Sequence, residues 1–260
     1  MKNLNLKKIK GYIEGYYGKL LSWEERFQII DTLHKNKMNF YFYCPKEDLN
    51  HRRNWRVKYN KKWMSDFIVF NNYAMKKNIS VIVGIAPGLD FDFKSYLKGS
   101  KEDLNFLKTK ISSFLKIGVN HISILFDDVP ESPYFKNLKY KEGEAHANLV
   151  NRISLEFNRP IFVVPRIYSD ELLIENPNYL IDFFGSLNNK SFSFYCGKLV
   201  VSKSFSTKIK MVKDKINENK IIYWDNFYCN DYCPKKLIIG PWKNKKLIEK
   251  TMINGTGLIK

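Results

Sequence analysis

The chain has 260 residues, of which 44% are hydrophobic, and its 44 Lys and Arg against 26 Asp and Glu give a formal net charge of +18. This length and hydrophobic content exclude a disordered chain, and no run of about 18 apolar residues is present to span a membrane. Lysines are spread along the whole chain, as in the Lys-, Ile-, Phe- and Asn-rich composition that an AT-rich genome imposes, so we do not expect the charge to mark a nucleic-acid partner.

Eight short apolar stretches, each ending in a Gly, Pro or polar residue, predict eight strands. In chain order they are IKGYIEG from Ile9, NFYFYCPK from Asn39, SVIVGIAPG from Ser80, HISILFDD from His121, PIFVVPRIY from Pro160, FSFYCG from Phe192, KIIYWDN from Lys220 and KLIIGP from Lys236. Because these runs are continuous rather than alternating, we expect strands that are buried on both faces, as in parallel sheets.

Helical patterns lie between the strands. The clearest are SWEERFQIIDTLHKNKM from Ser22, KWMSDFIVFNNYAMKKN from Lys62, KEDLNFLKTKISSFLKIG from Lys101 and EGEAHANLVNRISLEF from Glu142. Ser22 and Glu25 have the spacing of a capping box at the start of the first helix. Gly118 suits the position just after the end of the third helix, where glycine is common.

The alternation of strand and helix predicts an α/β fold, a (β/α)8 barrel of the TIM type, with a doubly wound open sheet as the alternative. Only 16 residues separate Lys220 from Lys236, too few for a strand and a full helix. The last β/α unit is therefore expected to be shortened or irregular, unless the eighth strand is misassigned. Since no Pro/Gly/Ser-rich linker divides the chain, we expect one domain over residues 1–260.

In barrels of this type, the chemistry takes place at the C-terminal ends of the strands. The side chains expected there are acids, amides and aromatic rings, which suit a sugar because hydroxyls need donors and acceptors and pyranose faces stack on rings. They are found at Glu14, Gly15, Lys46, Pro87 to Asp90, Asp127, Asp128, Tyr168, Tyr195, Trp224 to Asn226, and Asp231.

The adjacent acids Asp127 and Asp128 end the fourth predicted strand. Two neighbouring carboxylates cannot both ionise at low cost, so one should have a raised pKa. Consecutive strand residues point to opposite faces, so both acids reach one pocket only if the chain is leaving the strand. Taken alone, such a pair is more often part of a loop, a helix cap or a metal site.

If both acids do reach one pocket, they lie on the same side of the scissile bond, and neither is placed as a nucleophile on the opposite face. This favours substrate-assisted hydrolysis, in which the 2-acetamido oxygen of the sugar attacks its own anomeric carbon. One aspartate would orient the acetamido N–H. The other would protonate the leaving oxygen and then take a proton from water.

The sequence favours no metal or organic cofactor. Cys229 and Cys233 form a lone C-x3-C without a second pair, the four histidines have no metal-ligand spacing, and no glycine-rich phosphate-binding pattern is present. The N-terminus lacks the continuous apolar stretch of a secretory signal, and the cysteines, also at positions 44 and 196, suit packing as small hydrophobes. We therefore expect a reduced, cytoplasmic chain.

A series of motifs extends over nearly the whole chain, roughly Gly11 to Asn254. In order they are GYIEGYYG, NFYFYCPKEDLNHRRNWR, GIAPGLD, LFDDV, VPRIY, YWDNFYCNDY, IIGPW and INGTG. Together they resemble the catalytic domain of glycoside hydrolase family 84. This family comprises β-N-acetylglucosaminidases, including the protein O-GlcNAcases and bacterial enzymes once labelled hyaluronidases, and it has a (β/α)8 barrel and a substrate-assisted mechanism.

The resemblance implies a role for each matching residue. Asp127 matches the aspartate that holds the acetamido nitrogen, Asp128 the general acid/base, and Tyr168 the tyrosine that positions the acetamido group. Sugar hydroxyls would be bound by Gly15, Lys46, Asp231 and Asn254, and the acetamido pocket would be formed by Trp224 and Asn226.

The sequence departs from this family in two places. Where the family often has Trp-Thr-Gly-Pro after its sixth strand, this chain has Tyr195 to Lys198, so a larger or different 2-acylamido group is an open alternative. Only six residues follow Asn254, so we expect the helical region that usually follows the barrel to be absent. The cleft would then be more open, or be completed by another chain, for example in a homo-oligomer.

The function expected from these residues is that of a retaining β-N-acetylglucosaminidase, a glycoside hydrolase acting on terminal β-linked N-acetylhexosamine. Its partner would be a glycan or glycoconjugate that contains N-acetylglucosamine. The alternative is a sugar-binding or regulatory module with the same barrel and weak catalysis, which the short C-terminus and the altered sixth strand suggest.

Overall fold

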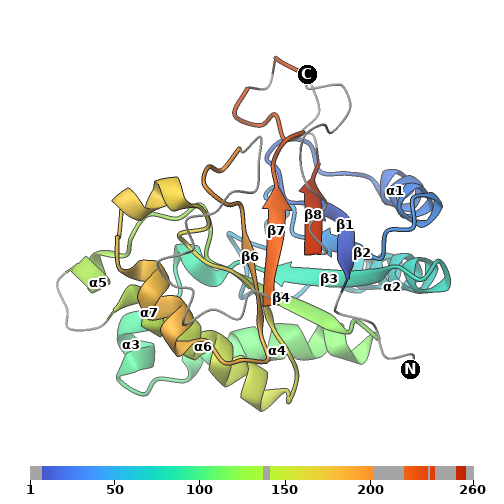
Figure 1. Cartoon of the computed structure of the whole chain (residues 1–260). Helices are drawn as coiled ribbons and strands as arrows, with labels where there is room; N and C mark the ends of the chain where they lie inside the picture. The colour runs from blue at the N-terminus through green and yellow to red at the C-terminus, as the bar shows by residue number, and fades with distance from the viewer. Residues whose placement is uncertain (1–7, 137–140, 202–219, 234, 238–249, 256–260) are drawn as a thin grey trace.

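The computed structural model describes residues 8–136, 141–201, 220–233, 235–237 and 250–255, and within them a closed barrel of eight parallel strands (Figure 1). The strands are β1 (Ile9–Glu14), β2 (Phe40–Tyr43), β3 (Ser80–Ile85), β4 (His121–Leu125), β5 (Phe162–Val164), β6 (Phe192–Tyr195), β7 (Ile221–Asp225) and β8 (Lys250–Asn254). Each strand pairs with the next, and β8 pairs with β1, which closes the ring. The predicted barrel is confirmed, and the open sheet is excluded.

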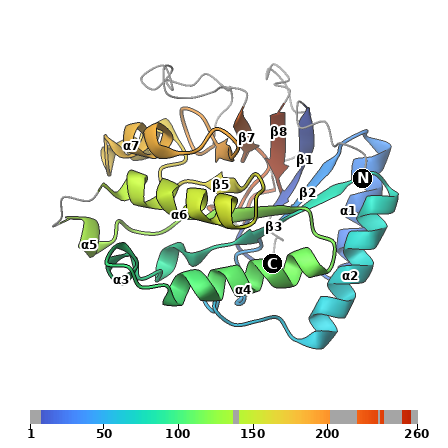
Figure 2. The same cartoon turned by 90° about the horizontal axis from the view of Figure 1, so that it is seen from below.

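The described helices lie around the outside of the barrel (Figures 1 and 2). They are α1 (Trp23–Lys35), α2 (Lys61–Lys76), α3 (Phe93–Leu97), α4 (Glu102–Lys116), α5 (Pro133–Lys136), α6 (Glu142–Glu156) and α7 (Tyr179–Ser186), with short 3-10 helices at Pro87–Leu89 and Asp170–Ile174. The four helices predicted from the sequence all form. The capping box is also confirmed, since Ser22 Oγ accepts the Glu25 N–H at 3.1 Å and the Ser22 N–H donates to Glu25 Oε2 at 2.6 Å. Gly118 has the positive φ, +85°, expected after α4.

Two apolar clusters explain why the strands read as continuous apolar runs. One cluster fills the inside of the barrel, where Phe42 stacks on Phe194 with ring centroids 4.9 Å apart. The other fills the space between the strands and the helices, where Tyr41 packs against Phe70 of α2. Because the interior is packed with side chains, a ligand can bind only at the ends of the barrel.

The eighth strand was predicted in the wrong place. The position between β7 and β1 is occupied by Lys250–Asn254, whereas Lys236 and Leu237 of the predicted strand are not in a strand and residues 238–241 lie outside the described part. The argument for a shortened last β/α unit, which rested on 16 intervening residues, therefore no longer applies. The single domain over residues 1–260 stays a prediction.

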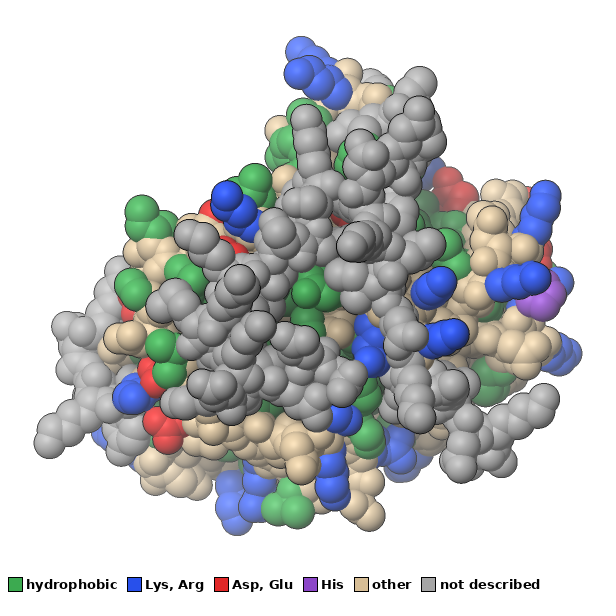
Figure 3. All heavy atoms as spheres, in the orientation of Figure 1, with side chains coloured by type: hydrophobic (Ala, Val, Ile, Leu, Met, Phe, Trp, Pro, Cys, Tyr) green, Lys and Arg blue, Asp and Glu red, His purple; other side chains and the backbone are tan. Residues whose placement is uncertain are grey.

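Among the described residues, no helix is both long and apolar enough to span a membrane. On the face shown in Figure 3, the described Lys and Arg side chains are scattered between apolar and neutral ones and do not form one patch.

Buried histidines give the barrel a pH-dependent stability. His146 stacks on Phe126 with centroids 4.1 Å apart, and burial lowers its pKa to about 3. Between this pKa and the unfolded value near 6.5, the unfolded chain binds a proton that the folded chain does not, so stability falls as the pH falls through this window. We expect the free energy of unfolding of the wild type, relative to His146→Phe, to fall by roughly 2 kcal/mol between pH 7 and pH 5.

Urea denaturation of both proteins at the two pH values measures this difference. His34→Gln, which changes an exposed histidine of α1, serves as the matched control and should produce no such change relative to the wild type. A difference between the wild type and His146→Phe that is independent of pH would show that His146 binds a proton as readily in the folded state as in the unfolded one.

Candidate active site

A cavity of about 330 Å3 opens at the C-terminal end of the strands, within the size range of small-molecule sites. The nine residues that the sequence singled out for catalysis or sugar binding all line it. They are Gly15, Lys46, Asp127, Asp128, Tyr168, Trp224, Asn226, Asp231 and Asn254. The structure thus brings together residues from both ends of the chain, and their chemical roles stay predictions.

Asp127 and Asp128 both reach this cavity because the chain has left the strand before them. Strand β4 ends at Leu125, and Asp128 adopts the left-handed conformation with φ +55°. For a residue other than glycine this conformation costs roughly 1–2 kcal/mol, so other contacts must hold it. The turn cancels the strand alternation that would send the two carboxylates to opposite faces.

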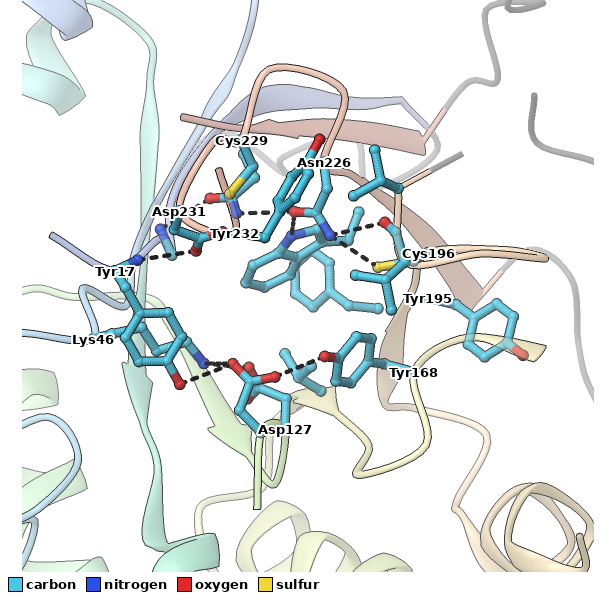
Figure 4. A pocket seen from close by; sticks show the side chains of 18 residues that line it. Tyr17, Lys46, Asp127, Tyr168, Tyr195, Cys196, Asn226, Cys229, Asp231 and Tyr232 are labelled. Atoms are coloured by element: carbon cyan, nitrogen blue, oxygen red, sulfur yellow. Dashed lines mark hydrogen bonds and ion pairs between the residues drawn. The ribbon is translucent and has the colours of Figure 1, made fainter. Parts of the chain in front are cut away.

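Lys46, from the loop after β2, bridges the two aspartates. Its ammonium is ion-paired with Asp127 Oδ2 and lies 3.2 Å from Asp128 Oδ2, and its side chain is only 2% exposed. Burial alone would lower the pKa of Lys46, but the two carboxylates outweigh burial and raise it above the ordinary value. The lysine therefore stays charged between the acids (Figure 4).

The environments of the two acids push their pKa values in opposite directions. Burial raises the pKa of Asp127, and the neighbouring charge of Asp128 adds to this while Lys46 opposes it. Burial also acts to raise the pKa of Asp128, but Lys46 and the hydrogen bond from Tyr168 outweigh it, so that this pKa is lowered. These opposite directions favour Asp127 over Asp128 as the carboxyl that binds a proton first when the pH is lowered.

The carboxylate of Asp128 is bound by two tyrosines as well as by Lys46. The Tyr168 hydroxyl donates to Oδ1 at 2.7 Å, and the Tyr17 hydroxyl donates to Oδ2 at 3.1 Å. Tyr17 was missed in the sequence, although it lies only two residues after Gly15 in the same motif. Its ring is 41% exposed, so it forms part of the cavity rim.

On the opposite side of the cavity, a network of amides links β7, β8 and the loop after β1. Asn226 Oδ1 accepts from Trp224 Nε1 at 2.7 Å and from Asn254 Nδ2 at 2.9 Å. Asn254 Oδ1 in turn accepts the Gly15 N–H at 3.1 Å. The network fixes the indole of Trp224 as one wall of the cavity.

Of the segment Tyr195 to Lys198, which the sequence predicted to alter one wall, Tyr195 and Cys196 line the cavity. The ring of Tyr195 lies away from the centre of the cavity, and its hydroxyl donates to Asp170 Oδ1 at 2.6 Å (Figure 4). Cys196 faces inwards, with its sulfur 3.6 Å from Asn226 Nδ2. Val200 and Val201 were not expected from the sequence and also line the cavity, so this wall is mainly apolar.

Asp231 lies across the cavity from the aspartate pair (Figure 4). Its Oδ2 accepts the backbone N–H of Tyr17 at 3.1 Å, which ties the loop after β7 to the loop after β1. Cys229 and the exposed Tyr232 lie on the same loop and also line the cavity, although neither was expected there. No cluster of three or more His, Cys, Asp or Glu side chains suited to a metal ion occurs in the described part of the chain.

Replacing Gly15 by alanine should impair sugar binding. The added Cβ would lie 2.6 Å from Cζ2 of Trp224, whose indole is enclosed by Phe42 and Phe194 with centroids 5.9 and 5.8 Å away. The indole must then shift into the cavity. Because overpacking of this kind costs roughly 1–3 kcal/mol, we expect the Kd for N-acetylglucosamine, measured by calorimetry, to rise about tenfold or more.

Gly99→Ala is the control for a general effect on stability. Gly99 has φ +100° with open space around it, so alanine there should lower the melting temperature and leave the Kd unchanged. An unchanged Kd in Gly15→Ala would mean that Trp224 does not border the bound sugar.

Comparisons with known proteins identify the family and the fold. The sequence model of the beta-N-acetylglucosaminidase family (NAGidase) matches residues 10–256. The Protein O-GlcNAcases of Mus musculus and Rattus norvegicus are 28% and 27% identical over 242 residues, which are 90% of this chain and 26% of each of those proteins. The chain thus spans about a quarter of the length of these curated relatives.

Two solved structures share the fold. The structure of CpGH84B superposes with a TM-score of 0.81 at 25% identity and covers 96% of this chain and 45% of that one. A mutant of the Thermobaculum terrenum O-GlcNAc hydrolase superposes with a TM-score of 0.82 at 28% identity and covers 95% of this chain and 55% of that one.

Proposed function

This chain belongs to glycoside hydrolase family 84, and from its cavity we propose that it is a retaining β-N-acetylglucosaminidase that releases terminal β-linked N-acetylhexosamine from a glycan or glycoconjugate. The observation that carries the proposal is the convergence of two consecutive aspartates on one cavity. Because consecutive residues cannot flank a sugar from both faces, neither Asp127 nor Asp128 serves as the nucleophile. The 2-acetamido oxygen of the substrate fills that role and forms a cyclic oxazoline, which water then opens with overall retention.

Asp127 is the residue that holds the acetamido N–H. Its Oδ1 atom is buried and has no hydrogen-bond partner among the described residues, so a turn of the carboxylate towards the cavity would offer an unsatisfied acceptor to the substrate N–H. Drawing the N–H towards a carboxylate makes the amide oxygen a better nucleophile. The apolar wall with Cys196 and Val200 suits the methyl group of the acetyl.

Asp128 is the general acid and then the general base, although Lys46 and Tyr168 lower its pKa. A substrate N–H bound to Asp127 stabilises the charged form of that carboxylate and lowers its pKa, so that Asp128 becomes the carboxyl that carries the proton. Asp128 then protonates the departing glycosidic oxygen. In the second step it takes a proton from the water that attacks the oxazoline.

Lys46 and Tyr168 keep the pair in place during these steps. An ammonium has three donors, of which two meet the aspartates, so a third is left for a sugar hydroxyl. The Tyr168 hydroxyl, bound to Asp128 in the empty cavity, can turn to the acetamido group when Asp128 is protonated. Asp231, across the cavity, would bind the outer hydroxyls of the sugar.

All four cysteines are free, which supports the proposal of a reducing, cytoplasmic environment.

The test is incubation with 4-nitrophenyl β-N-acetylglucosaminide. We expect release of nitrophenol, loss of its steady-state release in Asp127→Ala and Asp128→Ala, and the β-anomer as the first sugar product in a proton NMR time course. If no nitrophenol is released but N-acetylglucosamine binds tightly, the protein is instead a sugar-binding module. The α-anomer as the first product would overturn the retaining mechanism.

A further inference from the structure

Arg52 is a buried arginine whose hydrogen bonds go to neutral oxygens. It is 7% exposed, and among the described residues no ion pair joins it to a carboxylate. Its Nη2 donates to the backbone carbonyl of Asp128 at 2.6 Å, and its Nη1 donates to the Tyr17 hydroxyl at 2.7 Å. Both acceptors belong to the immediate surroundings of Asp128.

These two hydrogen bonds act on the backbone and on the carboxylate of Asp128. The charged donor binds the carbonyl of the residue that has φ +55°, and so favours this otherwise unfavourable conformation. The Tyr17 hydroxyl, which accepts from Arg52, directs its own hydrogen to Asp128 Oδ2 at 3.1 Å. One guanidinium therefore controls where the carboxylate points.

Arg52 lies on a firmly held segment. The Asp48 carboxylate accepts the backbone N–H groups of Asn50 and His51 at 2.9 and 3.3 Å. The buried Lys110 of α4 donates to the carbonyl of Asn50, and the N–H of Ala86, just after β3, donates to the carbonyl of His51 at 2.9 Å. The loop after β2 is thus tied to α4 and to the end of β3 immediately before Arg52.

We propose that Arg52 is a positioning residue, which sets the carboxylate of Asp128 for proton transfer to the leaving oxygen by holding its backbone carbonyl and Tyr17. The inference rests on the proposed acid/base function of Asp128. Arg52 does not touch the sugar in this proposal, so its loss should slow the proton-transfer step and leave substrate binding intact.

The experiment compares Arg52→Met with Arg52→Lys and with Arg53→Met, a matched control that removes the same charge from the exposed neighbouring residue. For an alkyl β-N-acetylglucosaminide, which needs protonation, we expect kcat/KM of Arg52→Met to fall about 10²-fold, with the Kd for N-acetylglucosamine unchanged. For an aryl glycoside with a good leaving group, the loss in kcat/KM, which reports the first step, should stay below about tenfold. Arg52→Lys, which keeps one charged donor, should restore part of the rate, and Arg53→Met should behave as the wild type.

A crystal structure of Arg52→Met gives a readout that does not depend on activity. We expect Asp128 to leave the left-handed conformation and its carboxylate to separate from Tyr168. An unmoved Asp128, or equal rate losses for alkyl and aryl substrates, would overturn the proposal. If Arg52→Met does not fold, Arg52→Lys carries the same comparison, with a smaller difference between the two substrates.

These outcomes distinguish a failure of the proposed glycosidase function from a failure of the proposed role of Arg52. A wild type that hydrolyses neither substrate contradicts the proposed function, while the position of Asp128 in the variant still decides whether Arg52 holds it. A wild type that is active, together with an Arg52→Met variant that shows no preference for good leaving groups, contradicts only the role of Arg52.

Discussion

The loss of kcat/KM in Asp128→Ala should depend on the leaving group of the substrate. A general acid contributes roughly 10²- to 10⁴-fold to a rate when the departing oxygen is basic, and little when it leaves as a stable phenolate. We therefore expect kcat/KM for an alkyl β-N-acetylglucosaminide to fall about 10³-fold or more. For a dinitrophenyl glycoside, kcat/KM should stay within about tenfold of the wild type, because this parameter reports the first step.

The second step should behave differently in the same variant. Opening of the oxazoline needs a base to take a proton from water, and Asp128→Ala lacks it whatever the leaving group was. With the dinitrophenyl substrate the oxazoline should accumulate, so that a burst of dinitrophenol precedes a slow steady state in stopped-flow measurements.

Asp127→Ala provides the comparison within the pair. Without Asp127 the acetamido oxygen is not activated, so the formation of the oxazoline should slow for alkyl and aryl glycosides alike, with no burst. If Asp128→Ala also loses rate equally on both substrates, the roles given to the two aspartates are misassigned.

The sequence allowed most of the barrel to be predicted because buried parallel strands produce continuous apolar runs. Seven strands begin within two residues of where those runs begin. The eighth failed because Lys250–Asn254 has only two strongly apolar residues, Met252 and Ile253, whereas the run after Lys236 looks more like a strand in isolation. Helix α7, Tyr179–Ser186, was not predicted, because its eight residues are too few and too generally apolar to show a helical period, although Asn178 before it is a residue type that often caps helices.

The residues that line the cavity could be predicted where they follow the end of a strand. They could not be predicted where their positions depend on contacts between loops. Asp127 and Asp128 could be expected to share a cavity only on the condition that the chain turns. The turn itself, a left-handed Asp128, leaves no mark in the sequence because this conformation is typical of glycine. Arg52 is 76 residues away from the carbonyl it binds, and Tyr17 lies 111 residues from the carboxylate, so neither contact is visible as a local pattern.

A thiazoline derived from N-acetylglucosamine should bind at least about 10²-fold more tightly than N-acetylglucosamine itself. Its fused five-membered ring resembles the cyclic intermediate, and an enzyme that stabilises the path to this intermediate binds such analogues better than products. Competitive inhibition of the aryl glycosidase activity gives both constants, and calorimetry gives them independently of turnover.

The source of this preference should be Asp127. Its Oδ1 has no hydrogen-bond partner among the described residues, so the carboxylate has acceptor capacity left for a donor on the ligand. A protonated ring nitrogen pairs with the ionised carboxylate in a buried position, where charge-assisted hydrogen bonds are strong. Asp127→Ala should therefore weaken the thiazoline far more than N-acetylglucosamine, and bring the two affinities to within about tenfold. Equal affinities in the wild type would mean that the amide oxygen of the substrate takes no part in the displacement, and a preference that survives Asp127→Ala would mean that another group meets the ring nitrogen.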